Sequence, residues 1–525
     1  MRRENGSVNL VGKTSELKLN IVTTLVNLLL GFLVGVILTP FLVAQLGPAR
    51  FGLVPLINAL VSYFAIFPQT ISAAISRNLT LAVHNDDRAR AQRIYFTSIA
   101  AVGLAILILS VPLTLLSVNI ASLVNVPPGA EVEGRVLSLA ISWTFLLSIG
   151  LLPFQSVSFC TNKTYLLALS SALQNVLRLG LTVALVLLLA ANLTSVGVAI
   201  VLSCCASFAF LALTTFRVAP WLNPMKRSFD GAEFLDLFKL SADILLMQVG
   251  TVAMMSSELV VVNLVFGDYT GGRYAAAVQL PYMLRNGITS LATLAAPVII
   301  ANYARGDVEL LAKSTIRAMR CIALAIALPT GFLAAAASET LALWLGTDFS
   351  TLSNLLALQS LALVLTSVVV PLYSVCLAAR RIWFPGAVQM LGAILFVGLA
   401  WLGSHSFDGP VAMACLFLGI FVVKELAYTI PYSAHCMGIN SSRFMSPIVY
   451  SLALFLVAYV ATTALGEVWP ARSRIGLASI AIAVTVPYTL MAWLLATYEE
   501  RTETASLVRG TGVGRWLFGI AQSAK

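Results

Sequence analysis

Blocks of about 20 or more mostly apolar residues recur along this chain from residue 17 to residue 497. An α-helix rises about 1.5 Å per residue, so each block can cross the roughly 30 Å hydrocarbon core of a bilayer. Backbone groups in lipid must be hydrogen-bonded within the protein, and the alternating pattern of a membrane β-barrel is absent, so each block should be a helix. The predicted fold class is therefore all-α: a polytopic membrane helical bundle of about 14 transmembrane helices.

The composition excludes a water-soluble fold. Charged residues make up 10% of the chain and hydrophobic residues 59%, whereas soluble domains carry about 25% charged residues. The net charge of +10 does not indicate a nucleic-acid partner, because the basic residues lie mainly in the loops between apolar blocks. Neither a nucleotide-binding glycine loop nor a metal-ligand spacing is present, which predicts a transporter without metal or cofactor rather than an enzyme.

Charged or Pro/Gly-rich breaks divide the apolar sequence into separate predicted spans. These lie near residues 18–44, 52–80, 94–118, 136–159, 164–190, 195–216, 240–265, 273–301, 315–337, 352–378, 382–403, 410–433, 446–465 and 473–497. With the N-terminus in the cytoplasm, most of the 32 lysine and arginine residues fall on the cytoplasmic side, as the positive-inside rule requires. Both termini are therefore predicted to be cytoplasmic. The arginines on the opposite side are Arg50, Arg135, Arg273, Arg472 and Arg474.

Two similar segments about 220 residues apart indicate an internal repeat. The first, Leu46–Gly52, contains Gly47 and Gly52, and the second, Phe266–Tyr274, contains Gly267 and Gly272. Each is followed by a long span, an aspartate-containing loop and a span with a proline. An even number of helices separates the two copies, so the repeat should be parallel rather than inverted.

The repeat predicts two six-helix lobes followed by a terminal pair of helices. The predicted parts are a cytoplasmic N-terminal segment (1–17), an N-lobe of helices 1–6 (18–216), a cytoplasmic linker (217–239), a C-lobe of helices 7–12 (240–433), a C-terminal helix pair (434–497) and a cytoplasmic amphipathic tail (498–525). The tail is equally consistent with a frayed end.

Ionisable side chains within the spans are candidate functional groups, because a charge at membrane depth costs several kcal/mol unless it faces a cavity or a partner. Arg285 lies midway along the span 273–301, and Arg178 midway along 164–190. An arginine binds phosphate oxygens in pairs and stays charged at any accessible pH, so an arginine-bearing cavity suits an anionic substrate. Glu258 and Asp243 share one face of their span and are candidates for ion coupling, although Asp243 is near the inner interface and is also consistent with a solvated carboxylate.

Uncharged polar residues also lie on the spans that occupy corresponding positions in the two copies of the repeat. Gln279 and Tyr282 lie near Arg285, whereas Asn27 and Gln69 belong to polar stripes on the first two spans, the second of which ends near Arg77. Together they predict a central, water-accessible cavity between the lobes. Amide and hydroxyl side chains in membrane helices are more often packing groups than ligand contacts, so the alternative of interhelical hydrogen bonding stays open for them.

Short motifs resemble the Wzx-type polysaccharide flippases. They are Leu46-Gly47-x-x-x-Phe51-Gly52-Leu53 after Thr39-Pro40-Phe41, the helix running to Ser76-Arg77-Asn78, and Ala342-Leu343-Trp344-Leu345-Gly346. That family belongs to a superfamily with the multidrug and toxin extruders and the lipid II flippases. The first span lacks the arginines expected of a lipid II flippase.

The resemblance implies a flippase in the bacterial cytoplasmic (inner) membrane that moves undecaprenyl-pyrophosphate-linked oligosaccharide repeat units by alternating access. It implies a lipid-linked oligosaccharide substrate, contact with membrane lipid, and polysaccharide polymerase and chain-length regulator proteins as partners. In such relatives cavity arginines meet the pyrophosphate, and Arg285 and, more loosely, Arg77 match these positions. The alternatives are an ion-coupled small-molecule exporter, a lipid II flippase or a membrane-embedded glycosyltransferase.

Overall fold

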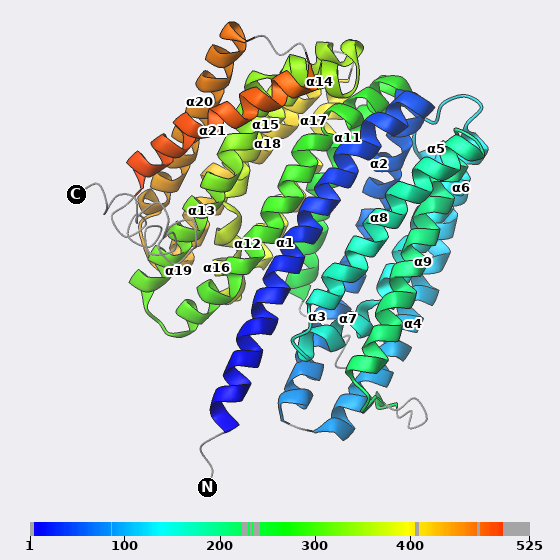
Figure 1. Ribbon diagram of the computed structural model, residues 1–525, viewed down its shortest axis with the longest axis vertical. Helices are drawn as coiled ribbons and strands as arrows, with labels where there is room; N and C mark the ends of the chain where they lie inside the picture. Colours follow the sequence, from blue (N-terminus) through cyan, green and yellow to red (C-terminus); the bar gives the residue numbers. More distant parts are fainter. Residues whose placement is uncertain are drawn as a thin grey trace, which may run out of the picture. The chain divides into compact units, whose positions relative to one another are not determined.

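The computed structural model of this protein describes residues 5–85, 87–222, 229–231, 234, 242–404, 409–469 and 473–496. Regular structure within these ranges is helical throughout, which confirms the all-α class (Figure 1). Fourteen helical segments of the described ranges are long and apolar enough to cross a membrane, and every predicted span overlaps at least one of them. The tail 498–525 and most of the linker 217–239 lie outside the described residues, and the predicted division into lobes stays a prediction.

The chain forms two compact units, each made of two stretches of sequence. The first comprises Met1–Met283 with Ala379–Tyr428, and the second Leu284–Ala378 with Thr429–Lys525. The helices of the first unit are α1 (Asn5–Leu46), α2 (Pro48–Ser62), η1 (Tyr63–Ala65), α3 (Ile66–His84), α4 (Arg88–Val118), α5 (Ile120–Leu123), α6 (Glu131–Gly150), α7 (Leu152–Cys160), α8 (Tyr165–Leu188), α9 (Leu193–Val218), α11 (Ala242–Ala277), α17 (Trp383–Leu402) and α18 (Pro410–Lys424).

Helix α1 packs along α8, and α8 packs along α9 (Figure 1). A buried amide joins α1 to the start of α8: Asn20 Nδ2 donates to the Asn162 carbonyl at 2.8 Å, and Asn20 Oδ1 accepts from the Tyr165 amide at 2.9 Å. Asn162 has a positive φ of 61°, which asparagine tolerates better than most residues. The single side chain of Asn20 therefore satisfies backbone groups at the turn that starts α8.

Two glycines let α2 and α11 cross at very short range. A Cβ placed on Gly52 would lie 2.4 Å from the Cα of Gly272, and one on Gly272 would lie 2.1 Å from the Pro48 carbonyl oxygen. No larger residue fits there without moving one backbone, so the two helices are fixed in register at this point. Gly52 and Gly272 are the glycines that the sequence repeat places at equivalent positions.

The two copies of the repeat have the same local geometry. Gly47 (φ 80°, ψ 160°) precedes α2, and Gly267 (φ 82°, ψ 178°) forms a kink in α11, so both redirect the chain with a backbone that favours glycine. Asp87 caps α4 by accepting from the Arg90 amide, and Asp307 caps α13 in the same way from Leu310, both at 2.9 Å. These correspondences support the internal repeat.

Two predicted boundaries move because of this geometry. The predicted span 52–80 is divided by the 3-10 turn η1 into α2 and α3. The predicted span 273–301 begins instead at Gln279, because α11 continues beyond the Gly267 kink to Ala277. Both differences are local backbone events that hydropathy does not record.

The second unit is organised around α13 (Val308–Ala335), which packs against α15 and α20. Its other helices are most of α12 (Gln279–Ala304), α14 (Ala337–Trp344), η2 (Thr347–Leu352), α15 (Ser353–Val368), α16 (Val370–Ala378), α19 (Ile430–Met437), η4 (Ser441–Phe444), α20 (Met445–Val468) and α21 (Arg474–Leu495).

The terminal helices α20 and α21 share one apolar core with α13. That core includes Ile326, Leu454 and Val484, all fully buried. Polar contacts join the same helices: Tyr488 donates its hydroxyl to the Leu324 carbonyl at 2.6 Å, and Arg320 donates to the Leu495 carbonyl at 2.7 Å. The C-terminal pair is therefore an integral part of the second unit.

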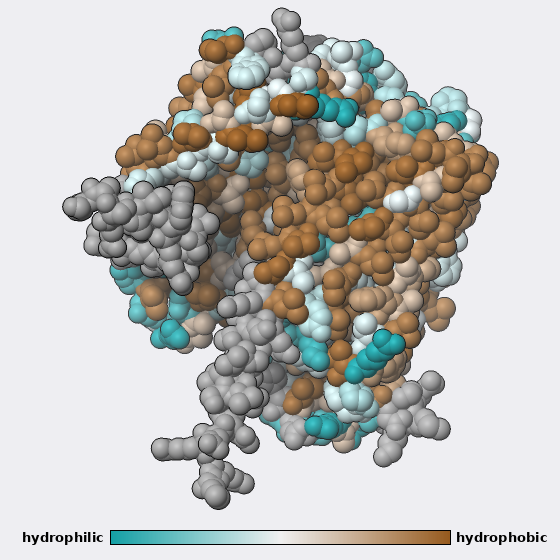
Figure 2. Space-filling model, in the orientation of Figure 1, coloured by the Kyte–Doolittle hydropathy of each residue, from teal (hydrophilic) through white to brown (hydrophobic). Residues whose placement is uncertain are grey.

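Hydrophobic side chains cover most of the helix surface on the face drawn in Figure 2, and hydrophilic side chains gather mainly near the helix ends. Leu107 and Leu187, for example, are 67% and 60% exposed within α4 and α8. Apolar groups exposed on this scale are unfavourable in water and favourable in hydrocarbon. The surface therefore supports the membrane assignment made from hydropathy.

Candidate functional site

A cavity of about 1120 Å³ lies within the first unit, between α3 on one side and α6 and α7 on the other. Its polar lining comes from Ser72, Ser76, Arg77 and Thr80 on α3, Ser148 on α6 and Gln155 on α7. Its apolar lining includes Phe145, Ile149, Leu152 and Phe159. A large apolar cavity with a few convergent polar groups is the usual form of a ligand site.

Arg77 provides the positive charge of this cavity. Its side chain is exposed on α3, and it makes no ion pair or hydrogen bond with any other residue that the structure describes. Beside it, Ser76 Oγ lies 3.0 Å from Ser156 Oγ of α7, and Ser156 in turn donates to the Leu152 carbonyl at 2.9 Å. The serine contacts hold α3 against α7, so the guanidinium extends from a fixed helix into open space.

The chemistry of the lining suits an amphiphilic anion. The guanidinium can bind two phosphate oxygens at once, and the hydroxyl and amide groups can hydrogen-bond to hydroxyl-rich ligands. Phe145 and Phe159 supply flat apolar surface on the opposite wall. Ser148, Gln155 and both phenylalanines were not predicted, because the packing of α3 against α7 and the cavity that they share with α6 are tertiary features that no local sequence pattern indicates.

Glu258 of α11 forms a second polar centre in the first unit. Its side chain is completely buried and accepts hydrogen bonds from the hydroxyl of Tyr274 at Oε1 and from the hydroxyl of Tyr282, 3.1 Å away, at Oε2. Two phenols directed at one carboxyl group stabilise its negative charge. Tyr282 was predicted as a cavity residue, whereas Tyr274 was missed because the kink at Gly267 brings it back towards Glu258.

Arg178 lies on α8 beside the contact with α1. One turn away, Asn175 Nδ2 donates to Asn27 Oδ1 at 3.5 Å, so the predicted Asn27 has a neighbour on the adjacent helix. The Nε of Arg178 is buried and has no hydrogen-bond acceptor among the described residues. A midmembrane guanidinium of this kind costs about 2.5–3.5 kcal/mol, so Arg178 remains a candidate contact for an anion.

The other predicted residues are more dispersed. Arg285 is half-buried within two turns of the start of α12. The Arg285 carbonyl accepts from the Thr289 hydroxyl at 2.9 Å. Gln279, the first residue of α12, is half-buried. The side chains of Gln69 and Asp243 lie outside the described residues.

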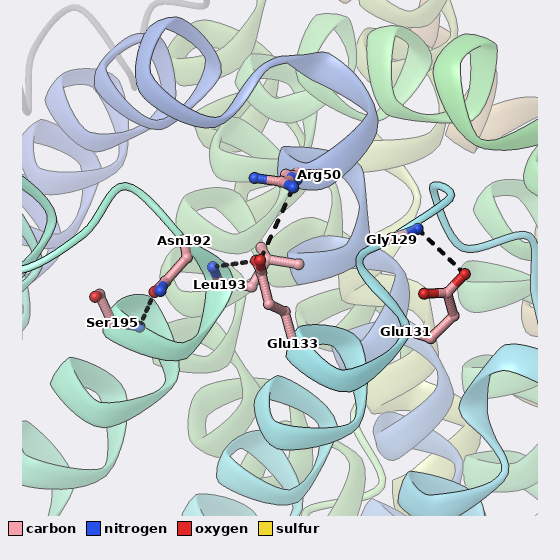
Figure 3. Close-up of polar contacts among 7 residues, drawn as sticks. All are labelled: Arg50, Gly129, Glu131, Glu133, Asn192, Leu193 and Ser195. Atoms are coloured by element: carbon pink, nitrogen blue, oxygen red, sulfur yellow. Dashed lines mark hydrogen bonds and ion pairs between the residues drawn. The ribbon is translucent and has the colours of Figure 1, made fainter.

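A polar cluster ties three elements together at the opposite end of α6 from α7 (Figure 3). Glu133 Oε2 accepts from the Leu193 amide at 3.0 Å, and Glu133 Oε1 lies 3.8 Å from Arg50 Nη2. Asn192 caps the same helix α9 through the Ser195 amide at 2.9 Å. The carboxylate therefore joins α6 to the start of α9 and to α2, a structural role that excludes it from the candidate site.

A buried ion pair lies at the end of α18. Lys424 Nζ lies 2.6 Å from Glu425 Oε1, and both side chains are 4% exposed. The pair lies where α18 passes into the π-helical turn Glu425–Thr429. Such turns are frequent at functional positions, but the short contact is also sufficient for a structural role.

Comparison with known proteins gives consistent results. Residues 17–302 match the family described as polysaccharide biosynthesis protein. The uncharacterized membrane protein EpsK of Bacillus subtilis (strain 168) is 27% identical over 495 residues, which covers 92% of this chain and 96% of EpsK.

Solved structures with the same fold include transporters of two kinds. The lipid II flippase MurJ in an inward closed conformation has a TM-score of 0.61 at 14% identity and covers 91% of this chain and 98% of its own. An inward-facing multidrug resistance MATE family transporter of the MOP superfamily has a TM-score of 0.58 at 14% identity, covering 86% and 98%. At these identities the likeness concerns the fold alone, and the predicted resemblance is confirmed at that level and at the level of the family.

Proposed function

Because this chain belongs to the polysaccharide biosynthesis protein family, we propose that it is a flippase for lipid-linked oligosaccharides. The proposed cargo is an undecaprenyl-pyrophosphate-linked repeat unit, moved across the bacterial inner membrane by alternating access. Both termini would lie in the cytoplasm, and a polymerase and a chain-length regulator would act on the product.

The observation that carries the proposal is the cavity at Arg77. It combines a guanidinium without a partner among the described residues, several hydroxyl and amide groups, and an apolar wall in one space of about 1120 Å³. A pyrophosphate would bind the guanidinium, and the sugars would meet Ser148 and Gln155. A positive charge in the cavity would repel cationic drugs, so it does not suit an exporter of such compounds.

Arg77→Ala should reduce surface polysaccharide by roughly ten- to a hundred-fold, because a charge-assisted hydrogen bond contributes about 1.5–3 kcal/mol. Arg77→Lys should restore part of the loss, since it keeps the charge but not the paired geometry. The measurement is the amount of polysaccharide made by a deletion strain that carries each variant at equal protein level, together with the lipid-linked precursor left inside.

Arg135→Ala is the matched control, because Arg135 is an exposed arginine of α6 that does not line the cavity. Normal polysaccharide in the Arg77→Ala strain would remove the cavity from the mechanism. If deletion of the gene instead left polysaccharide intact and made cells sensitive to cationic drugs, the chain would be a small-molecule exporter. Loss of peptidoglycan synthesis would identify a lipid II flippase.

A further inference from the structure

Two cysteines of the second unit lie close together where two of its helices end. Cys376 is two residues before the end of α16, and Cys436 is one residue before the end of α19. These helices pack against each other, and both side chains are present as thiols. Neither cysteine lines the Arg77 cavity, and neither has a role in the function proposed above.

Ser433 and Cys436 lie on the face of α19 that meets Cys376. Cys376 Sγ is 3.4 Å from Ser433 Oγ, and the Cys376 side chain also shares a hydrogen bond with the Cys436 side chain. Residues three apart in a helix lie on one side of it, so both contacts come from the same face of α19. The two sulfur atoms are therefore neighbours, although α17 and α18 separate the cysteines in the sequence.

The contact between these thiols is suited to disulfide formation. A disulfide joins its two sulfur atoms at about 2.05 Å and requires that the two backbones already be close. Cys376 and Cys436 are in side-chain contact across two packed helices. Rotation of the two side chains, rather than displacement of a helix, would bring the sulfur atoms to bonding distance.

The two thiols differ in their access to solvent. Cys376 is 0% exposed, whereas Cys436 is half-buried. His435 beside it is exposed, and the exposed Asn440 caps the turn η4 that follows α19, so this end of the helix is at a polar surface. Redox-sensing cysteines are often accessible thiols next to a second cysteine that resolves the first product. Cys436 suits the first role and Cys376 the second.

We propose that Cys376 and Cys436 are a redox-active dithiol that a low-molecular-weight disulfide oxidises. The Cys436 thiolate attacks one sulfur of the oxidant, forms a mixed disulfide and releases one thiol. Cys376 then loses its proton to water, and its sulfur attacks the Cys436 sulfur, which forms the Cys376–Cys436 disulfide and releases the second thiol. Two protein thiols are thereby oxidised, and one molecule of the oxidant is reduced to two thiols.

The bond would close a defined stretch of the chain. The second unit is interrupted in sequence between Ala378 and Thr429, and the inserted stretch 379–428 contains α17 and α18. Because Cys376 and Cys436 flank this stretch, their disulfide would join its two ends covalently. Separation of α16 from α19 would then require reduction of the bond, so the dithiol is a reversible covalent lock between these helices.

Glutathione disulfide is a probe that separates this step from ordinary modification of single thiols. The full-length protein in nanodiscs would be treated with it, unfolded, labelled with a maleimide and digested, and each cysteine would be followed by mass spectrometry. In the unaltered protein we expect Cys376 and Cys436 to lose maleimide labelling together and to appear as one cross-linked pair of peptides within a monomer. Dithiothreitol should restore the labelling of both.

Cys376→Ser should change the product rather than abolish the reaction: Cys436 should keep a glutathione adduct, because no second thiol displaces it. Cys436→Ser should leave Cys376 unmodified, since Cys376 is buried. Cys415→Ser is the matched control, because Cys415 is an exposed cysteine of α18, and it should leave the yield of the cross-link unchanged. A stable glutathione adduct on Cys436 of the unaltered protein, a cross-link between two molecules, or unchanged labelling of both cysteines would overturn the proposal.

Discussion

Glu258 is a carboxyl group whose burial is unfavourable for folding and for which we propose a role in coupling transport to an ion gradient. A carboxylate out of water is destabilised by several kcal/mol unless hydrogen bonds or an opposite charge compensate it. Here the hydroxyls of Tyr274 and Tyr282 both donate to Glu258, which is 0% exposed. A group that is fully buried and yet held by two donors is suited to exchanging a proton or binding a small cation, so we propose Glu258 as the coupling carboxyl.

Glu258→Gln should abolish gradient-driven transport and leave slow downhill movement of the substrate. An amide keeps the shape of the side chain but cannot carry the charge that a proton or cation neutralises. The measurement is movement of lipid-linked oligosaccharide in proteoliposomes with and without a proton or sodium gradient. Tyr282→Phe should weaken the same response partially, since Tyr274 still donates.

Glu467→Gln is the control for this pair of variants, because Glu467 is exposed near the end of α20. If the gradient stimulated Glu258→Gln as strongly as the unaltered protein, coupling would have to reside elsewhere.

The residues of the candidate site could be predicted only in part. Arg77 was singled out only through the family resemblance, since basic residues are common near the ends of membrane spans, and the structure places it in the lining of the cavity between α3, α6 and α7. Gln155 and Ser148 carry no such signal, because polar uncharged residues are common in membrane helices. The place of Arg285 along its helix depends on the bend of the chain at Gly267, which hydropathy does not record.

At the scale of elements, the helices themselves follow from hydrophobic length, whereas their interruptions do not. Each predicted span overlaps a helix because lipid enforces internal hydrogen bonding over the whole thickness of the membrane. The turn at Tyr63–Ala65 and the π-helical turn at Glu425–Thr429 depend on packing against neighbouring helices. No local sequence pattern therefore predicts them.

The crossing of α2 and α11 yields a prediction about stability. Gly52→Ala should destabilise the protein by about 1–3 kcal/mol, because its methyl group would overlap the backbone of Gly272. Gly103→Ala, in a helix where a methyl group meets no atom within 4 Å, should be neutral or slightly stabilising. Thermal unfolding in detergent measures both, and equal melting temperatures for the two variants would contradict the crowding at Gly52.

For the molecule as a whole, the distribution of basic residues predicts the orientation in the membrane. Loops rich in lysine and arginine stay on the cytoplasmic side during insertion, and the long polar segments of this chain carry most of them. If all fourteen candidate spans cross the membrane, the C-terminus lies on the same side as the N-terminus, as we predict from the sequence.

Reporter fusions can test this orientation. Green fluorescent protein fused to the C-terminus should fluoresce, and alkaline phosphatase fused there should be inactive, because the first folds in the cytoplasm and the second needs disulfides that form outside it. Phosphatase fused in the loop before Glu131 should be active. Activity of the C-terminal phosphatase fusion would mean that an odd number of spans crosses the membrane.

The contact of Gly52 with Gly272 has a consequence for the history of the chain. These glycines occupy the same place in the two copies of the repeat, so the copies touch each other through identical positions. If the gene arose by duplication, an ancestor of half the length would have dimerised through this glycine. The present crossing of α2 and α11 would then correspond to that dimer contact within one polypeptide. A half-length relative with a bulky residue at the equivalent position would argue against such an origin.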